Sequence, residues 1–237
     1  MLDRTFRAFH FAYHVSKAMI EVPVLNTSGQ EVGKFQLDES LLGTTVRPAL
    51  LKQAIVRHHA NQRQGTVKTK SRAEVEGSTK KLYAQKHTGN ARRGNIRTNV
   101  MKGGGNAFAK SPREFRQDMP LKQRRLARNN AILSKILSNT LVLLDGFTLP
   151  ANKTKEVVKV LSALKVDRSV LIATDGIDQN IYRSARNIQK TLIKPAAEIN
   201  AYDVLSKRTM IITKSAFENV LSTLKTDKKT TPAEANG

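Results

Sequence analysis

The chain has 237 residues with no cysteine and no tryptophan, and its 41 Lys and Arg against 19 Asp and Glu give a formal net charge of +22. The lack of cysteine excludes a disulfide framework, a thiolate metal site and a cysteine nucleophile, and no apolar run is long enough to span a membrane. So large a positive excess indicates a polyanionic partner, either a nucleic acid or an anionic membrane surface.

Residues 1–18 are basic and aromatic and allow two interpretations. Phe6, Phe9 and Tyr13 fall near one helical face, as in an amphipathic targeting presequence. Serine is scarce for such a leader, so we prefer the alternative interpretation, in which the start codon is misassigned and the native chain begins at Met19.

A hairpin and a helix are predicted next. Residues 21–26 and 31–37 flank Ser28-Gly29, a pair that suits a hairpin turn. Residues 47–60 carry an apolar helical stripe, and Pro48 suits the first turn of that helix.

The following segment, residues 61–111, is poor in core material and rich in charge. It holds eight large apolar residues in 51 and seven of the 13 glycines, and it shows neither a helical nor a strand period. Across residues 61–128, 18 basic residues stand against four acidic ones. Such a segment cannot bury enough apolar area to offset its ordering entropy. We therefore expect a basic loop at 61–111, either disordered or ordered by a partner.

Beyond the basic loop the pattern alternates between helices and buried strands. A helix is expected from about Pro120, with Asp118 as its possible cap. Further expected helices cover 153–165, from Asp178 to 188, and 215–224 with Ser215 and Glu218 spaced as a capping box. The expected strands are 141–144, 170–173, 191–193 and 210–212.

Continuous apolar strands that alternate with helices predict an α/β fold, a three-layer globular domain with a largely parallel sheet. The predicted organisation is a leader or misassigned start at 1–18, a globular domain at 19–60 and 112–225, the basic loop at 61–111 and a disordered tail at 226–237.

Two patterns suggest catalysis; we favour a structural interpretation of both and keep an enzyme that uses Asp145 and Asp175 as the alternative. Asp145, Asp175 and Asp178 follow predicted parallel strands, where a magnesium-dependent phosphoryl-transfer site is conceivable. Asp-Gly is ordinary turn chemistry, however, and Asp178 suits a helix cap. The triplet Gly103–Gly105 lacks the Lys-Ser/Thr that completes a phosphate loop. We expect no catalytic residue, no metal and no cofactor.

The basic loop carries the functional signal. Its cations are dispersed singly or in pairs among Gly, Thr, Asn, Gln and Ser, which fits contacts to a folded phosphate backbone. Tyr83 could stack on an unpaired base. The alternative is a solvated linker that binds only counterions. The candidate RNA contacts are Arg63, Lys68, Lys70, Arg72, Lys80, Lys81, Tyr83, Lys86, Arg92, Arg93, Arg97, Lys102, Gly103, Gly104, Gly105, Lys110 and Arg113.

The run RQGTVKTKSRAEVEGSTKKLYAQKHTGNARRGNIR, continued by GGGNAFAKSPREF, resembles the bacterial type of the universal L-four family of large-subunit ribosomal proteins. The resemblance covers roughly Met19 to Lys225, and the order of elements agrees as well. The family pattern is kept at Arg63–Thr66, Arg72–Val75, Lys80-Lys81, Gln85-Lys86, Thr88-Gly89, Ala91-Arg92, Gly103–Gly105 and Phe108.

This resemblance implies a structural, non-enzymatic constituent of the large ribosomal subunit, which binds large-subunit rRNA early in assembly. It implies an extended loop whose tip lines the peptide exit tunnel. It further implies neighbouring large-subunit proteins and the nascent peptide as partners, no membrane, and a ribosomal location in the cytoplasm in preference to an organelle. The tunnel tip maps to Lys86, His87, Thr88, Gly89 and Asn90. A free, non-ribosomal nucleic-acid-binding module is the alternative.

The chain departs from the family pattern at the tip. Leu82-Tyr83-Ala84 stands where Pro-Trp-Arg is usual, His87 replaces a glycine, and Asn90 replaces an arginine. If the family glycine has a positive φ, His87 must adopt it or the turn must change.

Overall fold

We describe a computed structural model of the chain over residues 19–38, 41–43, 45–149, 152–166 and 169–229, with side chains to residue 224. The chain divides into two compact units, which we call the globular unit (described residues up to His58 and from Met119) and the loop unit (His59–Asp118). The expectations for residues 1–18 and 230–237 concern parts of the chain outside these ranges.

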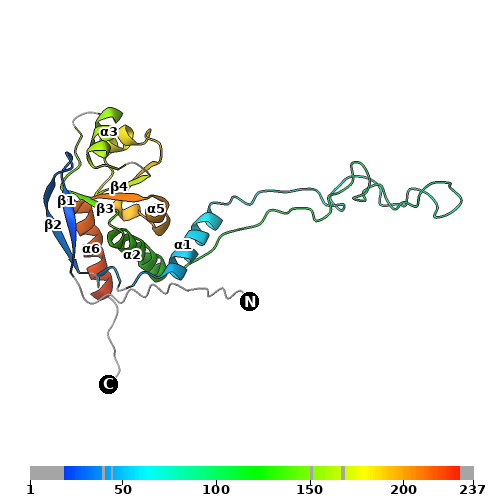
Figure 1. Cartoon of the computed structure of the whole chain (residues 1–237). Helices are drawn as coiled ribbons and strands as arrows, with labels where there is room; N and C mark the ends of the chain where they lie inside the picture. Colours follow the sequence, from blue (N-terminus) through cyan, green and yellow to red (C-terminus); the bar gives the residue numbers. More distant parts are fainter. Residues whose placement is uncertain (1–18, 39–40, 44, 150–151, 167–168, 230–237) are drawn as a thin grey trace, which may run out of the picture. The chain divides into compact units, whose positions relative to one another are not determined.

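The globular unit is built on one six-stranded sheet (Figure 1). Its strand order is β2-β1-β3-β6-β4-β5, in which β1 and β2 pair antiparallel and all the other neighbours pair parallel. The strands are β1 (Met19–Leu25), β2 (Glu31–Asp38), β3 (Leu141–Leu144), β4 (Val170–Thr174), β5 (Thr191–Pro195) and β6 (Thr209–Thr213). The predicted largely parallel sheet is confirmed.

The turn between β1 and β2 closes as the sequence predicts. The Asn26 side-chain oxygen accepts hydrogen bonds from the backbone N–H groups of Ser28 (2.9 Å) and Gln30 (3.2 Å). An Asn side chain that binds the backbone ahead of it in this way is typical turn chemistry. β1 also pairs with β3, so the N-terminal hairpin is part of the same sheet as the strands that follow the loop unit.

In the described part of the chain, six α-helices and the short 3₁₀ helix η2 accompany the strands. They are α1 (Pro48–Asn61), α2 (Leu121–Leu137), α3 (Thr154–Ala163), α4 (Gln179–Ala185), η2 (Ala196–Glu198), α5 (Ala201–Ser206) and α6 (Lys214–Lys229). No helix in the described part of the chain is both long and apolar enough to cross a membrane.

The strands separate two hydrophobic cores, which makes the domain three-layered. In β4, Leu171 and Ala173 belong to the core that holds buried residues of α1, α2, α5 and α6. The alternate residues Val170 and Ile172 belong to the core with α3 and α4. Because successive side chains of a strand point to opposite faces, helices cover both faces of the sheet. The predicted three-layer α/β class is confirmed.

The starts of α2 and α6 agree with the sequence to within about a residue, but both predicted caps are wrong. Pro120 is the N-cap of α2 and no side chain caps that helix. Asp118 lies two residues too early and is bonded to Arg116 instead (3.4 Å). Helix α6 begins at Lys214, which places Ser215 inside the first turn rather than at the cap. The capping box that does exist is on α5, where Asn200 and Asp203 bond each other's backbone N–H.

Two smaller differences concern the buried face of α3, on which the sequence pattern predicts both Val157 and Val158, and the length of α6. In α3 Val157 is fully buried but its neighbour Val158 is 46% exposed, because adjacent residues point about 100° apart on a helix. Helix α6 continues through Lys229, so residues 226–229 are helical, although the sequence predicts that the disordered tail begins at residue 226.

Candidate nucleic-acid interface

The loop unit contains no strand and, beyond the last turn of α1, no helix between residues 62 and 118, and hydrogen bonds between distant residues hold its two chain segments together. At its base the amide of Asn61 bonds both backbone groups of Gln117, accepting from N–H at 2.8 Å and donating to C=O at 3.2 Å. The N–H of Arg113 donates to the carbonyl of Gly65 (3.1 Å). Figure 1 shows the resulting long, narrow double trace.

An aromatic ring between two arginines stabilises the same region. The guanidinium carbon of Arg63 lies 3.6 Å from the centre of the Phe115 ring, and that of Arg113 lies 4.4 Å from it. Cation–π attraction therefore orients two of the predicted RNA contacts. Phe115 is not among the contacts predicted from the sequence. The signal that could have found it is an aromatic residue next to cations in a segment without a core.

The glycine triplet allows the loop unit to pack against its own backbone. A Cβ on Gly104 would lie 2.0 Å from the carbonyl oxygen of Thr98, and one on Gly105 would lie 2.2 Å from the backbone nitrogen of Arg72. No side chain fits at such distances. These residues therefore serve close approach within the loop unit, and their contact with a phosphate backbone stays a prediction.

The tip is closed by two bonds across its neck. The N–H of Leu82 donates to the carbonyl of Gly94 (3.0 Å). The Tyr83 hydroxyl donates to the carbonyl of Ala91. Between them, His87 has a φ of 64°. His87 therefore adopts the left-handed conformation itself, although it replaces the family glycine.

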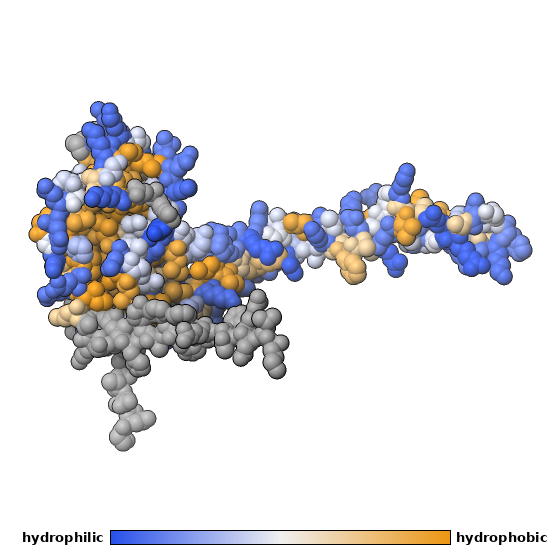
Figure 2. Space-filling model, in the orientation of Figure 1, coloured by the Kyte–Doolittle hydropathy of each residue, from blue (hydrophilic) through white to orange (hydrophobic). Residues whose placement is uncertain are grey.

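The predicted cations of the loop unit are exposed, with the exception of the half-buried Arg97. Lys68 pairs with Glu74 at 3.2 Å. A hydrogen bond from the Ser71 N–H, followed by the charge and hydrogen bond of Lys68, holds the pKa of the Glu74 carboxyl below its ordinary value of 4.5. Figure 2 shows a mostly hydrophilic surface along this unit, interrupted by separate apolar residues. On the face shown, apolar residues are scattered between the exposed polar and charged ones.

The globular unit contains a second cationic surface, which the candidate residues above do not include. A cavity of about 510 Å³ is lined by Arg57, Arg124, Arg125 and Arg128, beside the stacked rings of His58 and Tyr202, whose centroids lie 4.1 Å apart. The sequence does carry a signal for this surface, because arginines crowd the first turns of α2. Positive charge at the start of a helix is unfavourable to the helix dipole, so such crowding indicates a role other than helix stability.

The carboxyl ends of the strands hold structural aspartates. Asp178 caps α4 by accepting from the N–H groups of Asn180 (2.8 Å) and Ile181 (3.3 Å). Asp175 accepts from the amide of Asn219 (2.6 Å). No group of three potential metal ligands occurs among the described residues. The arrangement at this edge is that of turns and caps.

Comparison with known proteins decides the family. A family model described as "Ribosomal protein L4/L1 family" matches residues 35–222. The chain is 43% identical to the large ribosomal subunit protein uL4 of Symbiobacterium thermophilum over 202 residues, which cover 85% of this chain and 98% of that relative. The chain belongs to the ribosomal protein L4/L1 family.

Other similar L4 proteins give the same result. The uL4 proteins of Brevibacillus brevis and Lachnospira eligens are 43% and 41% identical, again over 85% of this chain and 98% of theirs. The resemblance drawn from the loop motifs is therefore confirmed. Members of the L4 family are structural proteins of the large ribosomal subunit that serve translation and not enzymes, so the catalytic alternative is excluded.

Proposed function

We propose that this chain binds large-subunit rRNA early in the assembly of the subunit, and that its loop unit reaches the peptide exit tunnel. The observation that carries the proposal is the loop unit itself, a narrow hydrogen-bonded hairpin with exposed cations along its length. A segment of this kind has no core of its own to stabilise it, and a folded polyanion would supply the missing interactions.

Two further features support rRNA as the ligand. The cations include arginines, which match phosphate geometry with two parallel hydrogen bonds and also stack on bases. The arginine-lined cavity of the globular unit offers a second surface of the same charge. Phosphate neutralisation then supplies much of the affinity, which should fall steeply with salt.

A titration with salt tests this proposal. Arg92→Ala with Arg93→Ala is expected to flatten the slope of log K against log salt by about 2, since each lost phosphate contact removes about 1. Lys155→Ala with Lys159→Ala on α3 removes the same charge from exposed positions of the globular unit and should leave the slope unchanged. Equal slopes for all three proteins would count against phosphate contacts at Arg92 and Arg93.

We also place the tip, Lys86 to Asn90, at the tunnel wall, where the nascent peptide passes. A photoreactive amino acid at His87 should cross-link to a stalled nascent chain. The same group at Tyr182, which is 48% exposed on the globular unit, should not. Cross-links from both positions or from neither would refute the tunnel placement.

The proposed partners are thus the rRNA, neighbouring large-subunit proteins and the nascent peptide, on ribosomes of the cytoplasm. Sucrose-gradient fractionation of native lysate checks the assembly. We expect about one copy of the chain per large subunit, and its presence only in ribosome-free fractions would favour a free nucleic-acid-binding module instead.

A further inference from the structure

We propose that Phe108 is an aromatic anchor of the loop unit, whose ring stacks on an unpaired base of the large-subunit rRNA. The inference rests on the proposed rRNA binding and assigns one position of contact within it. It does not concern the tip or the cations.

The backbone around Phe108 forms a bulge. The N–H of Asn106 donates to the carbonyl of Lys70 (2.9 Å), and the N–H of Thr69 donates to the carbonyl of Lys110 (2.9 Å). The N–H of Lys110 in turn donates to the Thr69 hydroxyl (2.7 Å). Thr69 and Lys70 are consecutive, whereas their partners are four residues apart. Residues 107–109 therefore have no residues opposite them, and a bulge of this kind redirects a side chain.

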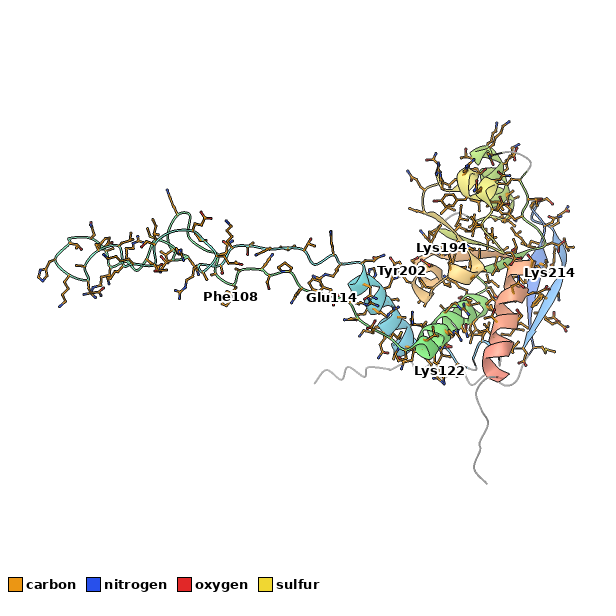
Figure 3. All side chains as sticks on the ribbon, turned by 180° about the vertical axis from the view of Figure 1, so that it is seen from behind. Phe108, Glu114, Lys122, Lys194, Tyr202 and Lys214 are labelled. Carbon is orange, nitrogen blue, oxygen red and sulfur yellow. The ribbon has the colours of Figure 1, made fainter. Side chains whose placement is uncertain are left out.

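The bulge presents the Phe108 ring to solvent in a strained conformation. Phe108 has a φ of 49°, which is an outlier for a bulky residue. Its exposure is 103%, the highest among the large apolar residues of the described chain. Figure 3 shows the labelled Phe108 on the loop unit. Neither the strained backbone nor the exposed ring stabilises the free protein. Strained backbone conformations of this kind are often found at ligand contacts.

The other Phe and Tyr side chains of the loop unit are already engaged. Phe115 lies between Arg63 and Arg113. Tyr83 is half-buried and bonded to Ala91. Among the described Phe and Tyr residues of this unit, Phe108 is the one whose side chain has no hydrogen bond, ring contact or cation contact.

The surroundings favour an RNA base over an apolar pocket in a protein. The residues that bound the bulge are Lys70 and Lys110 on the two chain segments, both exposed. The immediate neighbours of the ring, Ala107 and Ala109, add little apolar area. One isolated ring flanked by cations is the arrangement with which proteins stack a base while neutralising its phosphates.

The experiment measures binding of the full chain to protein-free large-subunit rRNA. Phe108→Ala and Phe108→Leu are expected to weaken binding about 5- to 100-fold, the range seen for removal of a stacking ring. Phe108→Trp should bind like the wild type. Phe108→Gly removes the ring yet accepts the positive φ, so it should lose as much as Phe108→Ala. Val100→Ala, at another apolar residue with 81% exposure, should have no effect.

Phe108→Trp also gives a direct probe, because the chain has no other tryptophan. Stacking predicts that rRNA quenches its fluorescence and shields it from acrylamide. The salt slope of Phe108→Ala should equal that of the wild type, since no phosphate contact is lost.

The outcomes separate this inference from the proposed function. If the wild type binds rRNA and Phe108→Ala binds equally well, or if Phe108→Leu binds as tightly as the wild type, the stacking role is overturned while rRNA binding stands. Normal binding of Phe108→Ala to protein-free rRNA with poor incorporation into subunits would assign the ring to a protein partner and overturn it as well. No binding by the wild type would refute rRNA binding itself.

Discussion

The Lys194 ammonium group lies 2.8 Å from Oδ2 of Asp203, and only 6% of the Asp203 side chain is exposed. The same oxygen accepts a hydrogen bond from the backbone N–H of Asn200 (3.3 Å) and so belongs to the cap of α5. Lys194 is in β5, the edge strand whose residues are all half-buried. This one carboxylate therefore links the edge strand to a helix only six residues long.

Asp203→Ala is expected to destabilise the globular unit by about 3 kcal/mol. Removal of one partner of a buried pair typically costs 3–5 kcal/mol, and we expect the low end because 31% of the Lys194 side chain remains exposed. Urea unfolding followed by circular dichroism measures the change. Glu21→Ala is the matched control, since its pair with Lys34 is 49% and 62% exposed and a surface pair of this kind contributes little to stability. Equal losses in both variants would contradict the assignment.

Deletion of Gly77–Ile96 should leave the globular unit folded. This unit holds both hydrophobic cores, and no residue of the deleted segment belongs to either. We expect the thermal midpoint to change by less than a few degrees while incorporation into subunits is impaired. Calorimetry checks the first point, and loss of cooperative unfolding would show that the units depend on each other.

Gly105→Ala should disrupt the middle of the loop unit, because the new Cβ would meet the backbone nitrogen of Arg72. A local cost of about 1–3 kcal/mol is typical of overpacking. Hydrogen exchange at Asn106, whose N–H is bonded to Lys70, should accelerate accordingly. Gly94→Ala is the control, since its Cβ would meet only a Thr98 methyl group at 3.6 Å. Unchanged exchange in Gly105→Ala would disprove the close approach.

Substitutions at His87 test the left-handed tip. His87→Gly should relieve about 1 kcal/mol of strain, since non-glycine residues are disfavoured at a φ of 64°. His87→Pro fixes φ near −65° and should open the neck. Hydrogen exchange at Leu82, whose N–H bonds Gly94, reports on that neck. Faster exchange in the glycine variant than in the proline variant would be incompatible with the structure.

The Glu74 carboxylate predicts an acid-sensitive contact in the loop unit. Its pKa is lowered from 4.5, first by the N–H of Ser71 and then by Lys68. A carboxyl group with a lowered folded-state pKa stabilises its contacts above the unfolded value and loses that stabilisation as the pH falls through the folded value. The contact should therefore persist at pH 4.5 and disappear below it.

Carbon NMR of the Glu74 side chain measures this titration. In Lys68→Met the midpoint should rise but stay below 4.5, because the bond from Ser71, the larger cause, remains. A wild-type midpoint at or above 4.5 would mean that the contact is not formed in solution.

Much of the globular unit was predictable because its strands are uninterrupted apolar runs. Val170 to Ala173 is buried at every position, which only a strand covered on both faces permits. Helix α5 and the 3₁₀ turn before it were missed, since three to six residues are too few to show a helical period. The cap at Asp178 was found from local chemistry alone, whereas the cap expected at Asp118 was wrong because Pro120 sets the start of α2.

The loop unit was predictable in composition and not in path. The charge of the segment predicts an interface, and the family motifs predict where its tip lies. The bond between Thr69 and Lys110 joins residues 41 positions apart, and no periodic pattern announces such a pair. The contacts of Arg63 and Arg113 with Phe115 and the bulge at Phe108 likewise depend on pairing between distant residues, so they became visible only in the structure.

The pairing of β1 with β3 also makes this protein a candidate for division into two chains. Val24 and Leu25 lie in register with Leu143 and Leu144, and the N–H of Asp145 bonds the carbonyl of Leu25 (3.0 Å). A break in the peptide backbone at the tip would remove the covalent link between the first three elements (β1, β2 and α1) and all the later ones. The non-covalent pairing of β1 with β3 would remain. The two fragments would still share one sheet and one core, so each could serve as the template on which the other recovers its fold.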